Sequence, residues 1–364
     1  MFEEGRILFL YAESPLHPGT GTALGPVDLP IQRERHTDFP TIQASGIKGV
    51  FRDVSRGLKI RFEKIKEEVN IASGDEKKKL EQTREKMANI IKKLIKKEEN
   101  GITKDDLDKL TECTNLVFGP EPAERPHEYA GALTFTDARI LLFPVRTLKG
   151  IFAWITCPMV LRRLERDSNY INDQQLLKLN NIPINLNALI STSEKVILPQ
   201  ESTINIDEKV ILEEFSFEIE KDMEKRQEAS KLAKVFSSKL FPKNNTYKFW
   251  EDKMSKDIII LPDNDFKDFV KISTEIIART RIDPEKGTVV KGALWYEEHL
   301  PPETVMYTLI LASHPRVGED NKGELKSAND AIKFFKTLVK EEPFYIRIGG
   351  DETVGKGIVR VKLL

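Results

Sequence analysis

A short apolar run followed by a long segment of turn-forming residues constrains the fold of this chain most strongly. Residues 6–11 have the sequence RILFLY, which predicts a buried first strand. Residues 13–41 then hold five prolines and three glycines and show almost no periodicity. Because loops of this length inside a compact domain are usually functional or disordered, we expect a specific loop that carries part of a site.

The rest of the chain mixes helical and strand patterns. The expected helices begin near Ala44 and further cover residues 61–69, 76–97, 220–240, 263–277 and 329–339. The expected strands and β-like runs lie at residues 132–160, 209–219, 257–261, 280–290, 293–299, 305–312, 345–348 and 358–363. Because the two kinds of element do not alternate regularly, the sequence predicts an α+β fold rather than a doubly wound sheet.

The helical patterns at 61–69 and 76–97 have an outer face made almost wholly of Lys and Glu. We expect two solvated helices that form an inserted hairpin, and an arm that touches RNA is the alternative. Ser73 and Glu76 predict a capping box for the second of these helices, and Asp263 predicts a cap for the helix at 263–277.

The charged residues of the chain nearly cancel. Lys and Arg number 57 against 58 Asp and Glu, whereas a general nucleic-acid coat is usually basic overall. Any RNA site must therefore be a local groove.

The cysteines and the apolar runs indicate the compartment. Cys113 and Cys157 form no C-x-x-C motif, which excludes a thiolate zinc site and suits a reducing environment. Residues 1–12 do not have the pattern of a signal peptide, and no apolar run approaches the ~20 residues of a membrane span. We therefore expect a soluble cytoplasmic protein.

A glycine-rich loop joins the last two expected strands. Residues 349–357 have the sequence GGDETVGKG, with four glycines in nine residues. Glycines allow a partner to approach the backbone closely, and successive N–H groups can hold a phosphate, to which Lys356 would add a positive charge. The alternative is a tight turn without a ligand.

Residues 45–52, SGIKGVFR, lie at an expected helix start. Ser45 can cap this helix and leave backbone N–H groups that favour an anion. Lys48 and Arg52 lie four residues apart, on one helical face, and could contact successive phosphates. A capped helix with two surface cations is an equal alternative.

Titratable and aromatic side chains gather in two further segments. The loop at 15–40 contains His17, Asp28, Arg33, Arg35, His36 and Asp38 among turn formers, which suggests a site, although a solvated surface loop is the alternative. The expected hairpin at 279–302 carries Arg279 and Arg281 on one arm and WYEEH (295–299) on the other. Aromatic residues beside cations bind single-stranded nucleic acid, although a Trp-Tyr pair in a strand more often packs in a core.

Together these motifs resemble the backbone RAMP subunit of the type III-B (Cmr) CRISPR effector. The similar stretches are residues 17–53, 118–161, 209–215, 273–301 and 348–361. The resemblance implies a single RAMP domain over residues 1–364, with a ferredoxin-like, RRM-related palm, a helical insertion at 55–115 and an inserted region at 165–240. A β-hairpin thumb completes this expected fold, and the hairpin at 279–302 is the best candidate for it.

The resemblance also implies partners and an activity. Copies of the protein would stack as a filament along a guide CRISPR RNA, together with other RAMP subunits, and each thumb would kink the guide–target duplex. The target RNA would be cleaved with a divalent metal ion, Mg or Mn. The residues implied in RNA binding are Ser45, Lys48, Arg52, Arg33, Arg35, Arg279, Arg281, Gly349, Gly350, Gly355, Lys356 and Gly357.

The implied catalytic residues are Asp28, His17 and Glu297, and the role of His299 is the least defined. RNA supplies its own nucleophile, the 2′-hydroxyl, if the backbone is bent into line. An ordinary Asp, with a pKa of about 3.9, is a poor base at neutral pH, so we expect Asp28 to hold the metal or to orient the 2′-hydroxyl. His17, with a reference pKa of about 6.5, is the more natural proton shuttle.

Three other functions remain open from the sequence. A subunit with the same fold could bind guide RNA without cleaving, or a RAMP endonuclease could process precursor guide RNA. An enzyme that uses the glycine loop for a phosphate cofactor is the third.

Overall fold

The computed structural model describes residues 2–99, 101–120, 129–173, 175–190, 194–318, 323, 325–340 and 342–364. Residues 121–128, part of one stretch that carries the resemblance, lie outside the described residues. No described helix is long and apolar enough to cross a membrane.

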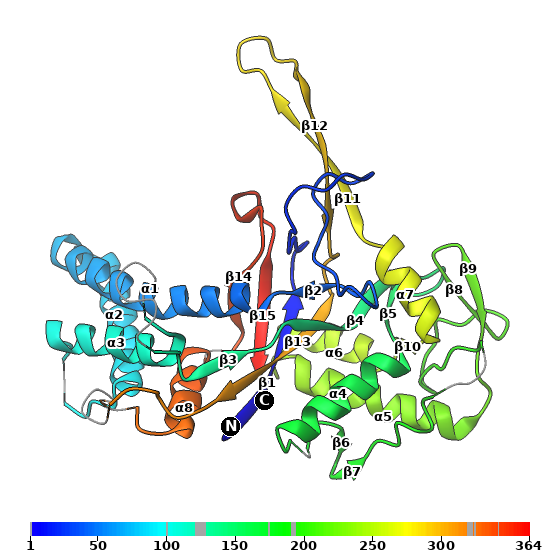
Figure 1. Cartoon of the computed structure of the whole chain (residues 1–364), viewed down its shortest axis with the longest axis horizontal. Coiled ribbons are helices and arrows are strands. Elements are labelled where there is room, and N and C mark those ends of the chain that lie inside the picture. Colours follow the sequence, from blue (N-terminus) through cyan, green and yellow to red (C-terminus); the bar gives the residue numbers. More distant parts are fainter. Residues whose placement is uncertain are drawn as a thin grey trace.

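A mixed sheet lies at the centre of the described structure (Figure 1). Its strand order is β10-β5-β4-β13-β1-β15-β14, with β2 added to β4 and β3 to β13. All these pairs are antiparallel except β10–β5. The strands are β1 Glu4–Ala12, β2 Thr41–Ile42, β3 Leu133–Phe135, β4 Ala138–Arg146, β5 Phe152–Thr156, β10 Ile258–Ile260, β13 Val305–Ala312, β14 Phe344–Arg347 and β15 Ile358–Leu363. The predicted α+β class is confirmed.

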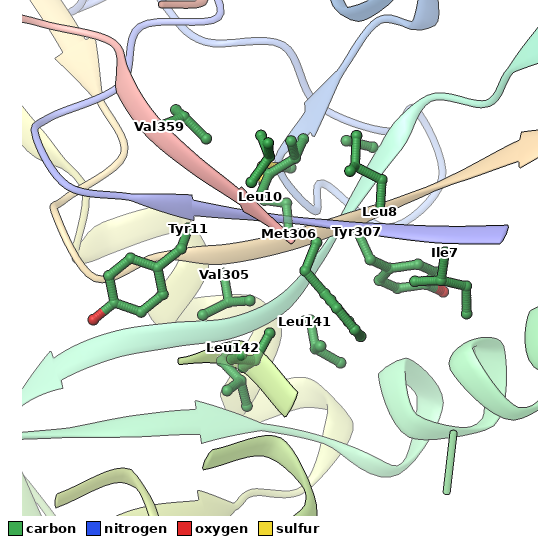
Figure 2. Close-up of a cluster of buried hydrophobic side chains, with 14 of the residues drawn as sticks. Ile7, Leu8, Leu10, Tyr11, Leu141, Leu142, Val305, Met306, Tyr307 and Val359 are labelled. Carbon is green, nitrogen blue, oxygen red and sulfur yellow. The ribbon is translucent and has the colours of Figure 1, made fainter. Parts of the chain in front are cut away.

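The two central strands of this sheet are buried on both faces. Every residue of β13 is buried, and β1 is buried from Ile7 to Ala12. Such continuous apolar runs are typical of strands that are covered on both sides, so the first strand predicted at 6–11 is confirmed. Figure 2 shows apolar side chains of β1, β4, β13 and β15 meeting in one cluster, with Tyr307 among them.

One group of helices packs beside β3 and the C-terminal strands (Figure 1). It contains α1 Ala44–Ile71, α2 Gly74–Leu94, α3 Lys104–Phe118 and α8 Ala328–Leu338. The first turns of α1 join the core, where Phe51 stacks on Phe135 and meets Phe335 edge to face. The two helices expected at residues 61–69 and 76–97 are confirmed as parts of α1 and α2, which pack against each other. The sequence pattern did not predict α3, a third helix that begins with a capping box of Thr103 and Asp106.

A second group of helices lies at the opposite end of the sheet, around β5 and β10 (Figure 1). Its helices are α4 Pro158–Tyr170, α5 Met223–Leu240, η1 Asn245–Tyr247, α6 Lys248–Met254 and α7 Asp263–Ile272. Two short strand pairs accompany them: β6 Lys178–Leu179 pairs with β7 Ile182–Pro183, and β8 Lys209–Leu212 pairs with β9 Phe215–Glu218. The single strand expected at 209–219 is therefore wrong, because Glu213 takes a positive φ of 50° and turns the chain back.

A two-stranded hairpin projects from the body of the molecule, as predicted (Figure 1). It pairs β11 Glu275–Ile282 with β12 Val289–His299. Its first arm starts within the segment expected to be helical, because α7 ends at Ile272 rather than at residue 277.

The cap predicted at Ser45 is wrong. The N-cap of α1 is Gln43, so Ser45 lies inside the first turn of the helix. The backbone N–H of Ala44 instead donates to Asp137 Oδ1 at 2.8 Å. A side chain distant in sequence thus replaces the local cap.

Two further cap predictions need correction. Ser73 is the N-cap of α2, but its side chain makes no capping hydrogen bond, so the box with Glu76 is not formed. The N-cap of α7 is Pro262, and Asp263 Oδ1 accepts a hydrogen bond from the Met159 N–H at 2.9 Å. Asp263 therefore satisfies the start of α4 rather than its own helix.

Phe51→Ala tests the packing of α1 on the sheet. Phe51 is fully buried, so we expect the substitution to lower the free energy of unfolding by about 3–5 kcal/mol. Ile60→Ala, an exposed site on the same helix, should change it by less than about 0.5 kcal/mol. Denaturant unfolding measures both, and equal effects would contradict this packing.

Candidate functional site

The loop 13–41 lies against the base of the projecting hairpin (Figure 1). Leu16 pairs with Leu300 in an antiparallel bridge, and Leu29 pairs with Glu297 in a parallel bridge. The Leu29 N–H donates to the Tyr296 carbonyl at 3.0 Å, and the Glu298 N–H donates to the Leu29 carbonyl at 3.0 Å. These backbone bonds hold the loop against β12.

The pairing of the loop with β12 fixes the orientation of the Asp28 side chain. Its Oδ2 accepts a hydrogen bond from the Tyr296 N–H at 2.8 Å, and its carbonyl accepts one from Ala23 at 2.9 Å. The residue is partly exposed. Its carboxylate is therefore oriented by the hairpin and accessible from solvent.

His17 is buried beneath the same loop. Its ring Nδ1 lies 2.6 Å from the Glu298 carbonyl oxygen, which can only accept, so Nδ1 carries the proton and donates a hydrogen bond to that oxygen. In the neutral ring, Nε2 then keeps its lone pair. A Cβ on Gly19 would lie only 2.6 Å from this Nε2, so a larger residue there would have to displace the His17 ring.

The end of β12 carries a buried acid and a buried imidazole. Glu297 Oε1 accepts a hydrogen bond from Trp295 Nε1 at 2.7 Å, and its Oε2 lies 3.4 Å from the guanidinium of Arg279. His299 Nε2 lies 4.0 Å from Glu297 Oε2 and 3.7 Å from Asp351 Oδ2. Among the described residues, these two acids and His299 form a group that could hold a metal ion, and Asp28 does not belong to it.

The charge state of His299 follows from its surroundings. Burial of the ring, with the electrostatic effect of the neighbouring His17 and Lys356, lowers the pKa of His299 to about 4. The imidazole is therefore neutral at neutral pH. The sequence did not predict a role for Asp351, because the local sequence of a glycine-rich loop does not reveal which distant residues lie next to it.

The glycine loop approaches His17 closely. The Gly350 N–H donates to the His17 carbonyl and the Gly357 N–H to the Pro15 carbonyl, both at 2.9 Å. Gly349 has a φ of 92°, and a Cβ there would lie 2.5 Å from the His17 oxygen. The expected cradle of free N–H groups is wrong for Gly350 and Gly357, and also for Gly355 and Lys356, whose N–H groups bond within the loop, around η3 Glu352–Val354.

A pocket of about 360 Å³ joins three of the predicted motifs. Its lining includes His17 and Gly19 of the loop 13–41, Ser45 and Gly46 at the start of α1, and Gly349 and Gly350 of the glycine loop. The start of a long helix favours an anion. The motifs that the sequence predicts separately therefore meet at one surface hollow.

The predicted cations have different environments. Arg33 lies within the protein, where its guanidinium pairs with Glu298 and donates to two carbonyl groups. Arg52 donates to the Phe118 carbonyl at 2.7 Å. Lys48 is partly buried, and burial together with Arg52 lowers the pKa of its ammonium group.

The remaining predicted cations lie on the hairpin and the loop. Arg35 and Arg281 are exposed. Arg279 is partly exposed, and its second guanidinium nitrogen lies 3.6 Å from Asp351 Oδ1. Arg35 and Arg281 are therefore better placed than Arg33 for contact with a polyanion.

Glu298→Ala should release the loop 13–41. The substitution leaves the mostly buried Arg33 guanidinium without its carboxylate, so we expect the free energy of unfolding to fall by about 3 kcal/mol. Hydrogen exchange of residues 16–33 should rise with it. Glu285→Ala, at the exposed hairpin turn, is the matched control. Unchanged exchange in the loop would show that Glu298 does not hold it.

Comparison with known proteins identifies the family. The model of the RAMP superfamily matches residues 9–360. The CRISPR system Cmr endoribonuclease Cmr4 of Pyrococcus furiosus is 37% identical over 356 residues, which cover 97% of this chain and 94% of that protein.

Two solved structures resemble this fold. Oligomeric Cmr4 from Pyrococcus furiosus superposes with a TM-score of 0.59 at 30% identity, over 99% of this chain and 97% of that chain. A chain of the type III-B Cmr-beta complex bound to cognate target RNA gives a TM-score of 0.63 at 20% identity, over 100% and 98% of the two chains. The chain belongs to the RAMP superfamily and, within it, to the family of Cmr4.

Proposed function

We propose that this chain is a backbone subunit of a type III-B CRISPR effector, which binds guide RNA as a filament of copies and cleaves the paired target RNA at regular intervals. Cleavage is supported by the 37% identical relative, which is named an endoribonuclease. The partners are supported by the similar oligomeric protein and the similar complex with target RNA. The observation that carries the proposal is the position of Asp28 and His17 at the base of the projecting hairpin.

The central strands support a ferredoxin-like palm. The segments β1-α1-β4 and β13-α8-β15 interleave, so that the sheet order is β4-β13-β1-β15 with antiparallel neighbours. This is the arrangement of a split β-α-β fold. We assign the palm to these elements, and the remaining helices of the two groups, which are α2, α3, α4, α5, α6 and α7, to additions around it.

The guide would lie over the pocket beside α1. Ser45, Gly349 and Gly350 line that pocket, and Lys48 lies one helical turn further along α1. A helix start and nearby cations attract phosphate groups without reading the base sequence. This suits a subunit that must hold guides of any sequence.

The hairpin of β11 and β12 would be the thumb. Its exposed large apolar side chains are Ile276, Ile282, Val289, Leu294 and Tyr296. Apolar groups on a projecting element can insert between bases and kink a duplex. The kink would fall beside Asp28, because that residue bonds to the backbone of the thumb at Tyr296.

Cleavage would use the 2′-hydroxyl of the target as nucleophile. The kink would bring this oxygen into line with the scissile phosphorus, which accounts for much of the rate enhancement. Asp28 would orient the hydroxyl or contribute to holding a cation, because a carboxylate is a poor general base at neutral pH. His17 would move the proton through Nε2, since its Nδ1 donates to the Glu298 carbonyl.

A divalent metal ion, Mg or Mn, fits the residues present. Glu297 Oε2 is a buried carboxylate oxygen without a hydrogen-bond partner among the described residues, which is the kind of atom a cation would satisfy. When bound, the metal would neutralise charge that develops on the phosphate.

Asp28→Ala should abolish target cleavage in the assembled complex while guide binding remains. We expect the rate to fall by about 10²–10⁴-fold, as when a positioned acid or base is lost. Asp75→Ala, an exposed acid on α2, is the control. Cleavage of labelled complementary RNA and co-purification of guide RNA measure the two properties. Lost assembly in the Asp28 variant would instead make Asp28 structural.

The cleavage products distinguish the nucleophile. Attack by the 2′-hydroxyl should leave a 2′,3′-cyclic phosphate and a 5′-hydroxyl, and a 2′-deoxy nucleotide at the cut should block cleavage. A chelator should stop the reaction. A 3′-hydroxyl product would require an activated water and contradict the proposed nucleophile. Complete inactivity would favour the scaffold, and cutting of precursor guide RNA by the isolated protein would favour a processing enzyme.

A further inference from the structure

The end of the thumb strand β12 and the glycine loop place three metal-binding side chains together. Glu297, His299 and Asp351 each offer one ligand atom, and these atoms lie within 4.8 Å of one another. His299 Nε2 lies 3.7 Å from Asp351 Oδ2 and 4.0 Å from Glu297 Oε2. The cluster joins two segments that are about fifty residues apart in sequence.

Three polar atoms of this cluster, on His299 and Glu297, are buried without a hydrogen bond among the described residues. His299 is 0% exposed, and neither of its ring nitrogens makes a hydrogen bond among the described residues. Glu297 is 3% exposed, and its Oε2 accepts no hydrogen bond, although the Arg279 guanidinium lies 3.4 Å away. Because buried polar groups are normally hydrogen-bonded, such atoms are suited to hold a water molecule or an ion.

The spacing of His299 from the two carboxylates fits one small cation. Metal bonds to imidazole nitrogen and carboxylate oxygen are about 2.0–2.2 Å long, so two ligands of one ion lie at most about 4.4 Å apart. Both distances from His299 satisfy this limit.

We propose that Glu297, His299 and Asp351 bind one divalent transition-metal ion, with Mn²⁺ or Zn²⁺ preferred to Mg²⁺. One imidazole with two carboxylates suits these ions, whereas Mg²⁺ prefers oxygen ligands alone. The inference deepens the proposed cleavage function, because it assigns the cation to these residues rather than to Asp28. Arg279, whose guanidinium lies 3.4 Å from Glu297 and 3.6 Å from Asp351, is the competing cation.

Titration of the isolated full-length protein with Mn²⁺, followed by the electron paramagnetic resonance of free Mn²⁺, tests this site. The wild type should bind one ion. Asp351→Asn should weaken binding by at least about tenfold, the scale seen when groups that support metal ligands are lost. Asparagine tolerates the left-handed backbone of residue 351, at a φ of 62°, so this variant should fold.

Two further variants distinguish the site from its neighbours. Asp28→Asn should bind Mn²⁺ as the wild type does, and Arg279→Met should bind it at least as tightly. Terbium luminescence excited through tryptophan gives a second readout, because Trp295 Nε1 contacts Glu297 Oε1 at 2.7 Å. Trp295→Phe should remove most of this sensitised emission.

Two results would overturn the proposal. A wild-type protein that binds no Mn²⁺ would leave only water in the cluster. Loss of binding in Asp28→Asn but not in Asp351→Asn would move the ion to Asp28. Cleavage by the assembled complex is a separate assay, so Mn²⁺ binding without RNA cleavage would support the site while rejecting the proposed function.

Discussion

The buried side chain of Glu298 connects the segments on which the candidate site depends. Its Oε1 accepts hydrogen bonds from Arg33 and Thr274, and its Oε2 accepts one from the Ile31 N–H. Its backbone carbonyl accepts a hydrogen bond from the Nδ1–H group of His17. A buried charge is costly unless it is paired and hydrogen-bonded, so this set of partners fixes where the loop 13–41 lies on the hairpin. Asp28 and His17 take their positions from that register.

The strand β12 both anchors the loop 13–41 and carries the proposed metal ligands, because successive side chains point to opposite faces of a strand. Glu298 points toward the loop 13–41, while Glu297 and His299 point toward Asp351 on the glycine loop. A shift of the strand by one residue would exchange these two sets. The anchor and the proposed metal ligands therefore depend on a single register, and the long backbone pairing of β11 with β12 maintains it.

Some arginines of this chain are bonded within the protein and others are exposed to solvent, and the net charge is close to zero. Arg33 and Arg52 bond to groups within the protein, whereas Arg35 and Arg281 remain exposed. A filament of copies would disfavour a large net charge, because like-charged subunits repel one another. The exposed cations would attract RNA most directly, which would fit a local groove rather than a basic coat.

Patterns local in the chain predicted much of this protein. The apolar runs predicted β1 and β13, the turn residues predicted the loop and the projecting hairpin, and the motifs predicted the family. These features depend on the preferences of neighbouring residues for helix, strand or turn. By contrast, the caps at Ser45 and Asp263 were wrong. The helix α1 begins before Ser45, where the distant Asp137 accepts the Ala44 N–H, and Asp263 accepts a hydrogen bond from the distant Met159 N–H instead of capping its own helix. The meeting of Asp351 with Glu297 and His299 could not be predicted either, since it depends on how the sheet folds two loops onto each other.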